Sequence, residues 1–152
     1  AQLLANLDTV DLDGNRIDGS LLAGHRLTMV NIWATYCSPC ISELPELARL
    51  SRDMESQGVQ VVGIPSDCVD NSFAPAPMLV AYAKELLGGA GADYPQLLPN
   101  ADMYMKFLAS VNSVPTTFFV DETGTLVGQV YIGSRDYDAW AAIIQETLAL
   151  VP

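Results

Sequence analysis

Cys37 and Cys40 stand three residues apart in a short polar stretch that follows an apolar one. Two thiols at this spacing can form an intrachain disulfide and exchange it with the thiols of another molecule. In that chemistry a thiolate attacks a disulfide sulfur, a mixed disulfide forms, and a second thiol releases it. The pair therefore predicts thiol–disulfide exchange, with Cys37 as the nucleophile and Cys40 as the resolving thiol.

The segments on either side of the pair should place it at the start of a helix. Residues 29–33 form a nearly continuous apolar run, typical of a strand covered on both faces. Apolar residues at helical spacing follow the pair: Ile41, Leu44, Leu47, Ala48 and Leu50. Pro39 suits the first helical turn, where a missing N–H costs nothing. The positive end of the helix dipole favours a thiolate at Cys37, and Cys40, one turn further in, should be more covered.

The stretch Trp33-Ala34-Thr35-Tyr36-Cys37-Ser38-Pro39-Cys40, with a distant Val114-Pro115-Thr116, resembles the thioredoxin superfamily. Glu43 and Pro45 make it more similar to the TlpA/ResA-like branch, extracytoplasmic thiol–disulfide oxidoreductases often tied to cytochrome maturation. The likeness extends from about Leu7 to the C-terminus. It implies a thioredoxin-like α/β fold, with a central mixed β-sheet flanked by helices and an N-terminal β-hairpin. Residues 1–152 are expected to form one such domain.

The resemblance also implies roles for four further residues. Glu43 would accept a proton from the cysteine pair, although an acid near a helix N-terminus is also stabilised by the helix dipole alone. The Val114–Pro115 bond would be cis and packed beside the pair, with the Val114 backbone free to pair with an extended substrate. Tyr36 stands where the family usually has Trp and would touch the substrate. The expected substrate-binding residues are therefore Tyr36, Val114 and Pro115.

Asn31 departs from the general thioredoxin pattern, which has a buried Asp six residues before the first cysteine. Because Asn cannot take up a proton, more of the proton transfer would depend on Glu43. Thr35 is interpreted as turn structure and Trp33 as a core residue.

Cys68 and His25 are weaker candidates. Cys68 could reshuffle with Cys37 as a third redox thiol, but an isolated thiol in a loop is the preferred interpretation. His25, the only histidine, lies at the wrong end of its strand to act as a base for Cys37.

Composition excludes several other classes of function. The chain has 18 acidic residues against 7 Lys and Arg, a net charge of −11, which disfavours nucleic acid and anionic membranes as partners. Three cysteines are too few for a disulfide scaffold, and one histidine gives little material for a metal site. We expect no metal and no cofactor. The expected partners are proteins with disulfides or thiols, and a redox protein that recycles the pair.

The start of the sequence is compatible with a mature or truncated chain whose signal or membrane anchor is absent, and the sequence leaves open whether such a segment was removed. No apolar run approaches the ~20 residues that span a bilayer, and the sequence begins at Ala1 without a basic and apolar leader. A missing signal or membrane anchor would agree with the extracytoplasmic location, periplasmic or anchored facing outside, that the resemblance implies.

Three alternatives to a reductant remain open. The first is a disulfide-forming oxidant of the same fold, because the residues between the cysteines tune a potential that spans roughly −270 to −120 mV among such proteins. The second is a thiol peroxidase, although peroxiredoxins carry a Thr three residues before the active cysteine and Thr35 is two before Cys37. The third is a non-catalytic binding module that uses the groove beside Pro115.

The apolar periodicity and the turn residues predict the remaining elements. The expected strands are 6–10, 26–33, 59–64, 94–98, 114–121 and 126–132, and the expected helices are 20–24, 39–57 (with Pro45 inside), 78–87, 101–109 and 136–150.

Overall fold

Four strands form the central sheet of the computed structural model, which describes residues 1–152. In spatial order they are β4 (Val59–Pro65), β3 (Leu27–Trp33), β5 (Thr116–Val120) and β6 (Leu126–Ile132). Strand β4 runs parallel to β3, whereas β5 is antiparallel to β3 and β6 is antiparallel to β5. The sheet is therefore mixed, as predicted.

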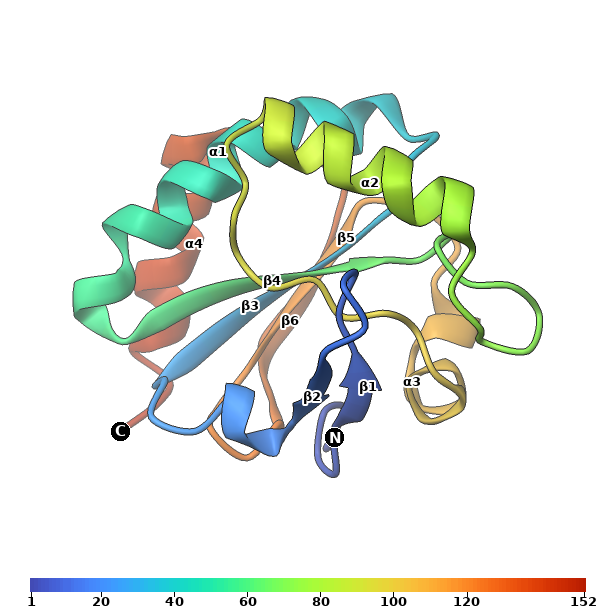
Figure 1. Cartoon of the computed structure of the whole chain (residues 1–152). Coiled ribbons are helices and arrows are strands. Elements are labelled where there is room, and N and C mark those ends of the chain that lie inside the picture. The colour runs from blue at the N-terminus through green and yellow to red at the C-terminus, as the bar shows by residue number, and fades with distance from the viewer.

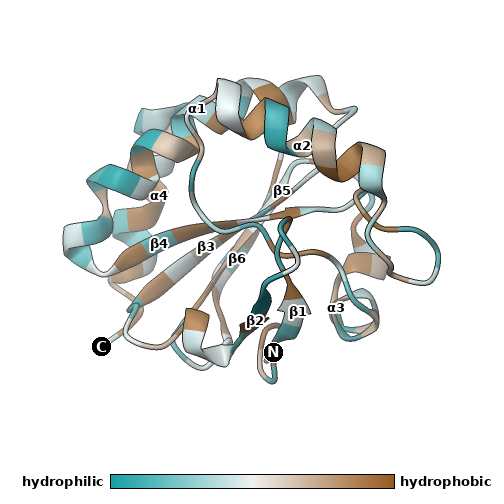
Figure 2. Cartoon of the chain, viewed as in Figure 1, coloured by the Kyte–Doolittle hydropathy of each residue, from teal (hydrophilic) through white to brown (hydrophobic).

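Helices cover both faces of this sheet (Figure 1). Because side chains alternate along a strand, Met29 and Trp33 of β3 face one apolar cluster and Val30 and Ile32 face another. The first cluster is completed by α1 (Ser38–Asp53), α2 (Pro77–Gly89) and α4 (Tyr137–Leu148). The second is completed by α3 (Ala101–Lys106) and the N-terminal segment. Every residue of β3 is buried, and Figure 2 shows apolar colour along β3 and β4.

The N-terminal hairpin predicted from the Asp-Gly turn is present. Strands β1 (Asp8–Val10) and β2 (Arg16–Asp18) pair antiparallel, and Gly14 has the positive φ of 83° that this turn requires. A single turn of 3₁₀ helix, Gly19–Leu21, follows. The hairpin and its flanking residues cover the face of the sheet opposite α1.

Helix α1 connects the two parallel strands. Pro39 occupies its first turn and Pro45 lies inside it, as predicted. The prediction that this helix extends to Gln57 is wrong, because it ends at Asp53 and a separate 3₁₀ turn, Glu55–Gln57, follows. The tighter i→i+3 bonds of that turn bring the chain to Gly58 (φ 80°), where it reverses into β4.

Two further predictions of elements need correction. Residues 94–98 form only a one-residue bridge, Gly63 to Gln96, because Pro95 and Pro99 cannot donate to a strand ladder. The helix predicted over 101–109 stops at Lys106. Phe107 leaves helical geometry (φ −153°) and places its ring 5.1 Å from that of Phe118, and a 3₁₀ turn, Leu108–Ser110, follows. None of the helices combines the length and the apolar character that crossing a bilayer requires.

Candidate active site

Cys37 and Cys40 form a disulfide at the N-terminus of α1, with Cα atoms 5.2 Å apart. Cys37 is the N-cap residue, and the backbone nitrogen of Cys40 lies 3.2 Å from Sγ of Cys37. Cys37 is 6% exposed and Cys40 only 1%, so an attacking sulfur reaches Cys37 more easily. When the bond is reduced, the free N–H groups of this helix end favour a thiolate at Cys37.

The Val114–Pro115 peptide bond lies beside the nucleophile and is cis, as the resemblance implied. The carbonyl oxygen of Val114 is 3.6 Å from Sγ of Cys37. Sheet topology explains this contact between residues 77 positions apart. Because β5 is antiparallel to β3 and pairs Thr116 with Ile32, the segment before β5 must lie beside the segment after β3.

Glu43 lies on α1, three residues after Cys40, and is 2% exposed. Its carboxylate accepts hydrogen bonds from Nδ2 of Asn31 (3.1 Å), the backbone N–H of Arg135 (2.8 Å) and Nε1 of Trp140 (2.9 Å). Burial raises the pKa of Glu43 above its ordinary value, and the hydrogen bonds from Trp140, Arg135 and Asn31 offset part of that rise. Because burial raises its pKa, Glu43 holds a proton more readily than an exposed Glu does, so it can accept one from a nearby thiol.

The residues that hold Glu43 were not evident from the sequence. The sequence marks Asn31 as a departure from the thioredoxin pattern but does not indicate its bond to Glu43, and Asn31 also donates to Thr117 (3.0 Å). Nothing in the sequence connects Arg135 or Trp140 with Glu43. Arg135 lies in the loop after β6, 92 positions from Glu43, and Trp140 lies on α4, 97 positions from it. The Arg135 guanidinium lies 5.2 Å from the centre of the Trp140 ring and stabilises the position of the indole.

We expect a Trp140→Phe variant to raise the pKa of Glu43 further. The substitution keeps an aromatic ring against Phe119 and Tyr131 but removes one donor to the carboxylate, and that donor favours the charged form. The Glu43 carboxyl can be titrated by NMR in both proteins in the oxidised state. An unchanged or lowered pKa in the variant would contradict the assigned hydrogen bond.

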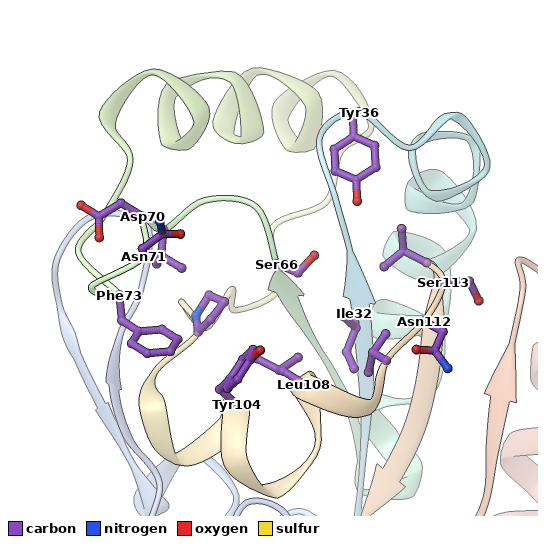
Figure 3. A pocket seen from close by; sticks show the side chains of 14 residues that line it. Ile32, Tyr36, Ser66, Asp70, Asn71, Phe73, Tyr104, Leu108, Asn112 and Ser113 are labelled. Atoms are coloured by element: carbon purple, nitrogen blue, oxygen red, sulfur yellow. The ribbon is translucent and has the colours of Figure 1, made fainter.

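A groove of about 620 Å³ opens beside the redox pair (Figure 3). Tyr36 is 76% exposed, and its phenol points from the edge into the groove. Val114 lines the same groove, whereas Pro115, immediately before β5, is buried. Tyr36 and Val114, two of the predicted substrate-binding residues, thus meet at one surface next to Cys37.

Thr35 forms part of the turn, in agreement with its interpretation as turn structure. Its backbone N–H and its hydroxyl both donate to the Asp67 carboxylate, which ties the loop after β3 to the loop after β4. Trp33 is fully buried, and its indole N–H donates to Gln96.

Cys68 is a free, buried thiol, and His25 lies before β3, at the end of that strand far from Cys37. The Sγ atom of Cys68 contacts the Leu79 carbonyl oxygen (3.6 Å). Burial, together with the neighbouring Asp67 charge, raises the pKa of Cys68 to about 12, which leaves it as an unreactive thiol at neutral pH. This geometry agrees with the interpretation of Cys68 as an isolated loop thiol.

A family model described as the AhpC/TSA family matches residues 2–129 of the chain. Thiol-disulfide oxidoreductase ResA of Bacillus subtilis is 29% identical over 117 residues, which cover 77% of this chain and 59% of ResA. Thiol:disulfide interchange protein DsbE of Allochromatium vinosum is 30% identical over 124 residues, which cover 82% of this chain and 61% of DsbE. The chain thus spans about three fifths of the length of these curated relatives.

Solved structures share the fold. A thiol:disulfide interchange protein of the thioredoxin family from Chlorobium tepidum superposes with a TM-score of 0.73 at 24% identity, covering 93% of this chain and 92% of that one. A secreted Mycobacterium tuberculosis disulfide oxidoreductase superposes with a TM-score of 0.71 at 17% identity, covering 95% and 97%. These similarities establish a thioredoxin-like fold for this chain.

Proposed function

This chain belongs to the AhpC/TSA family, and on that premise we propose that it is a thiol–disulfide oxidoreductase that acts on protein cysteines. The observation that carries the proposal is the Cys37–Cys40 disulfide at a helix N-terminus, with the Val114 carbonyl beside its outer sulfur. The names of ResA and DsbE, the two relatives described above, support the same reaction class.

In the reducing direction the pair starts as two thiols. The Cys37 thiolate attacks one sulfur of a substrate disulfide, and the other substrate sulfur leaves as a thiolate that takes up a proton. Cys40 then gives its proton to Glu43 and attacks Sγ of Cys37, which releases the second substrate thiolate. That thiolate takes up a proton, so two electrons and two protons pass to the substrate, and the Cys37–Cys40 disulfide is the product.

The remaining assignments extend this proposal. Tyr36, Val114 and Pro115 shape the surface that receives the substrate, and a second redox protein reduces the pair after each turnover. The protein works outside the cytoplasm, periplasmic or membrane-anchored, in a pathway such as cytochrome maturation. The similarity to ResA and DsbE and the TlpA/ResA-like pattern around Glu43 support this location and direction.

The redox equilibrium of the pair tests both the activity and its direction. The protein is held in graded thiol/disulfide buffers, trapped by alkylation and examined by mass spectrometry. We expect a midpoint near or below about −230 mV, as for a dedicated reductant. A midpoint near about −120 mV would make the protein a disulfide-forming oxidant.

Two other results would remove the proposal. If the pair never forms a disulfide, the exchange reaction cannot occur. If the reduced protein consumes hydrogen peroxide in the presence of a thiol reductant faster than it reduces a protein disulfide, it is a thiol peroxidase of the same family.

A further inference from the structure

Three aromatic side chains surround the groove beside the redox pair. Tyr36 reaches in from the turn before Cys37, Phe73 from the loop between β4 and α2, and Tyr104 from α3. Aliphatic side chains of Ile32, Leu108 and Val114 fill the space between them. We call the surface formed by these six residues the aromatic groove. Its apolar walls suit an apolar side chain.

Phe73 is held in this wall against its own backbone preference. Its φ of 61° lies in the left-handed region, which a bulky side chain rarely occupies. The loop around it is firmly built, since Val69 pairs with Pro75 and one oxygen of Asp70 accepts N–H bonds from Ser72 (2.8 Å) and Ala74 (3.0 Å). The result is a Phe73 ring that lies 6.0 Å from the Tyr104 ring, both at the groove (Figure 3). Such an outlier kept in a rigid loop points to function.

The charges of the groove select what can enter it. Asp70, at its edge, is the only charged residue that lines it, and no Lys, Arg or His does so. Only one oxygen of Asp70 is engaged by the loop backbone. The whole chain carries a net charge of −11, so an acidic segment would be repelled and a basic one attracted.

A second hollow lies on the other side of Tyr36, lined by Ile41 of α1 and by Leu79 and Tyr82 of α2. Val114, whose carbonyl lies beside Sγ of Cys37, lines the aromatic groove and not this hollow. A polypeptide that pairs with the Val114 backbone while its cysteine meets Cys37 therefore continues into the aromatic groove.

We propose that the aromatic groove binds the substrate polypeptide itself, through an apolar side chain and a neighbouring Lys or Arg close to the reacting cysteine. The inference rests on the proposed function and adds to it the class of substrate. Phe73 and Tyr104 contact the apolar side chain, and Asp70 faces the cation at the edge.

Synthetic peptides test this selection. Each carries one cysteine as a mixed disulfide with thionitrobenzoate, whose release is followed by absorbance when the reduced protein attacks the peptide sulfur. One set carries a Leu and a Lys within four residues of the cysteine, a second replaces both by Ala, and a third replaces the Lys by Glu. The small disulfide 5,5′-dithiobis(2-nitrobenzoate) reports on the redox pair without a peptide.

We expect the Leu/Lys peptides to react about tenfold faster than the Ala peptides, the scale on which an apolar pocket discriminates, and the Glu peptides to be slowest.

In a Phe73→Asn variant the ratio of the Leu/Lys rate to the small-disulfide rate should fall about tenfold. Asn tolerates a positive φ, so this variant removes the ring without adding strain. Tyr104→Ala is the second variant, and thermal unfolding of each verifies the fold. Tyr82→Ala, in the other hollow, should leave the ratio unchanged.

Equal rates for the three peptide sets would overturn the inference, as would an unchanged ratio in both groove variants or a matching loss in Tyr82→Ala. If the wild-type protein fails to react even with the small disulfide, the proposed function fails instead. The two failures are thus distinguishable.

Discussion

A Cys40→Ser variant is expected to accumulate as a covalent complex with its substrate, whereas Cys37→Ser is expected to lose exchange down to the uncatalysed rate. Sγ of Cys37 is the outer sulfur beside Val114, so only its loss prevents the first attack. Without the Cys40 thiol the first step still proceeds, but nothing releases the mixed disulfide. Non-reducing gel electrophoresis and mass spectrometry of the variants, incubated with an oxidised protein substrate, would detect the complex.

Cys68→Ala is the matched control for these two variants. The Cys68 thiol is buried in the loop after β4 and has a raised pKa, so its loss should leave both the rate and the amount of complex unchanged. The assignment of roles would be wrong if Cys37→Ser trapped the complex and Cys40→Ser did not. A loss of exchange in Cys68→Ala would show that a third thiol takes part.

A Glu43→Gln variant is expected to slow the resolution of the mixed disulfide by about 10²-fold, the usual contribution of a positioned acid or base. The amide is nearly the same size as the carboxylate and can keep its bonds to Arg135 and Trp140, but it cannot accept a proton. Its NH₂ group would face the Asn31 amide, which can turn over to accept. Stopped-flow measurement of substrate release across pH would check this. The change of the release rate with pH that the titration of Glu43 causes in the wild type should be absent from the variant.

The same substitution should change how stability depends on pH. Because burial raises the pKa of Glu43 in the folded protein above its ordinary value of 4.5, the folded state favours the protonated carboxyl. Its contribution to stability is therefore fully present below pH 4.5 and is lost as pH rises through the raised pKa. A folded-state pKa that lies one pH unit above the unfolded-state pKa corresponds to about 1.4 kcal/mol of stability.

Denaturant unfolding of both proteins at several pH values measures this effect. Relative to Glu43→Gln, the wild-type free energy of unfolding should fall as pH rises from 4.5, the ordinary pKa of Glu43, through its raised pKa in the fold. Glu85→Gln, at an exposed site on α2, should show no such difference from wild type. Parallel pH profiles for wild type and Glu43→Gln would contradict the raised pKa.

The sequence alone determined the local architecture of the redox pair. The apolar run of β3, the polar turn and the periodic residues of α1 lie next to one another in the chain, so their patterns predicted the strand, the position of Cys37 at the helix start and the covered Cys40. The alternation of strands and helices, with the resemblance, also predicted the mixed sheet. The predicted ends of elements were wrong where the backbone conformation depends on a distant contact. Phe107, for example, leaves helical geometry and packs on Phe118.

Only the tertiary structure decided what surrounds the pair. The insertion of β5 antiparallel to β3 brings Val114 to Cys37, and the packing of α4 on α1 brings the Trp140 indole to Glu43. Phe73 joins Tyr104 through a loop whose conformation opposes its own backbone preference. Periodicity indicates which face of an element is buried. The residues that meet there depend on strand order and helix packing, which are set by the free energy of the whole folded chain.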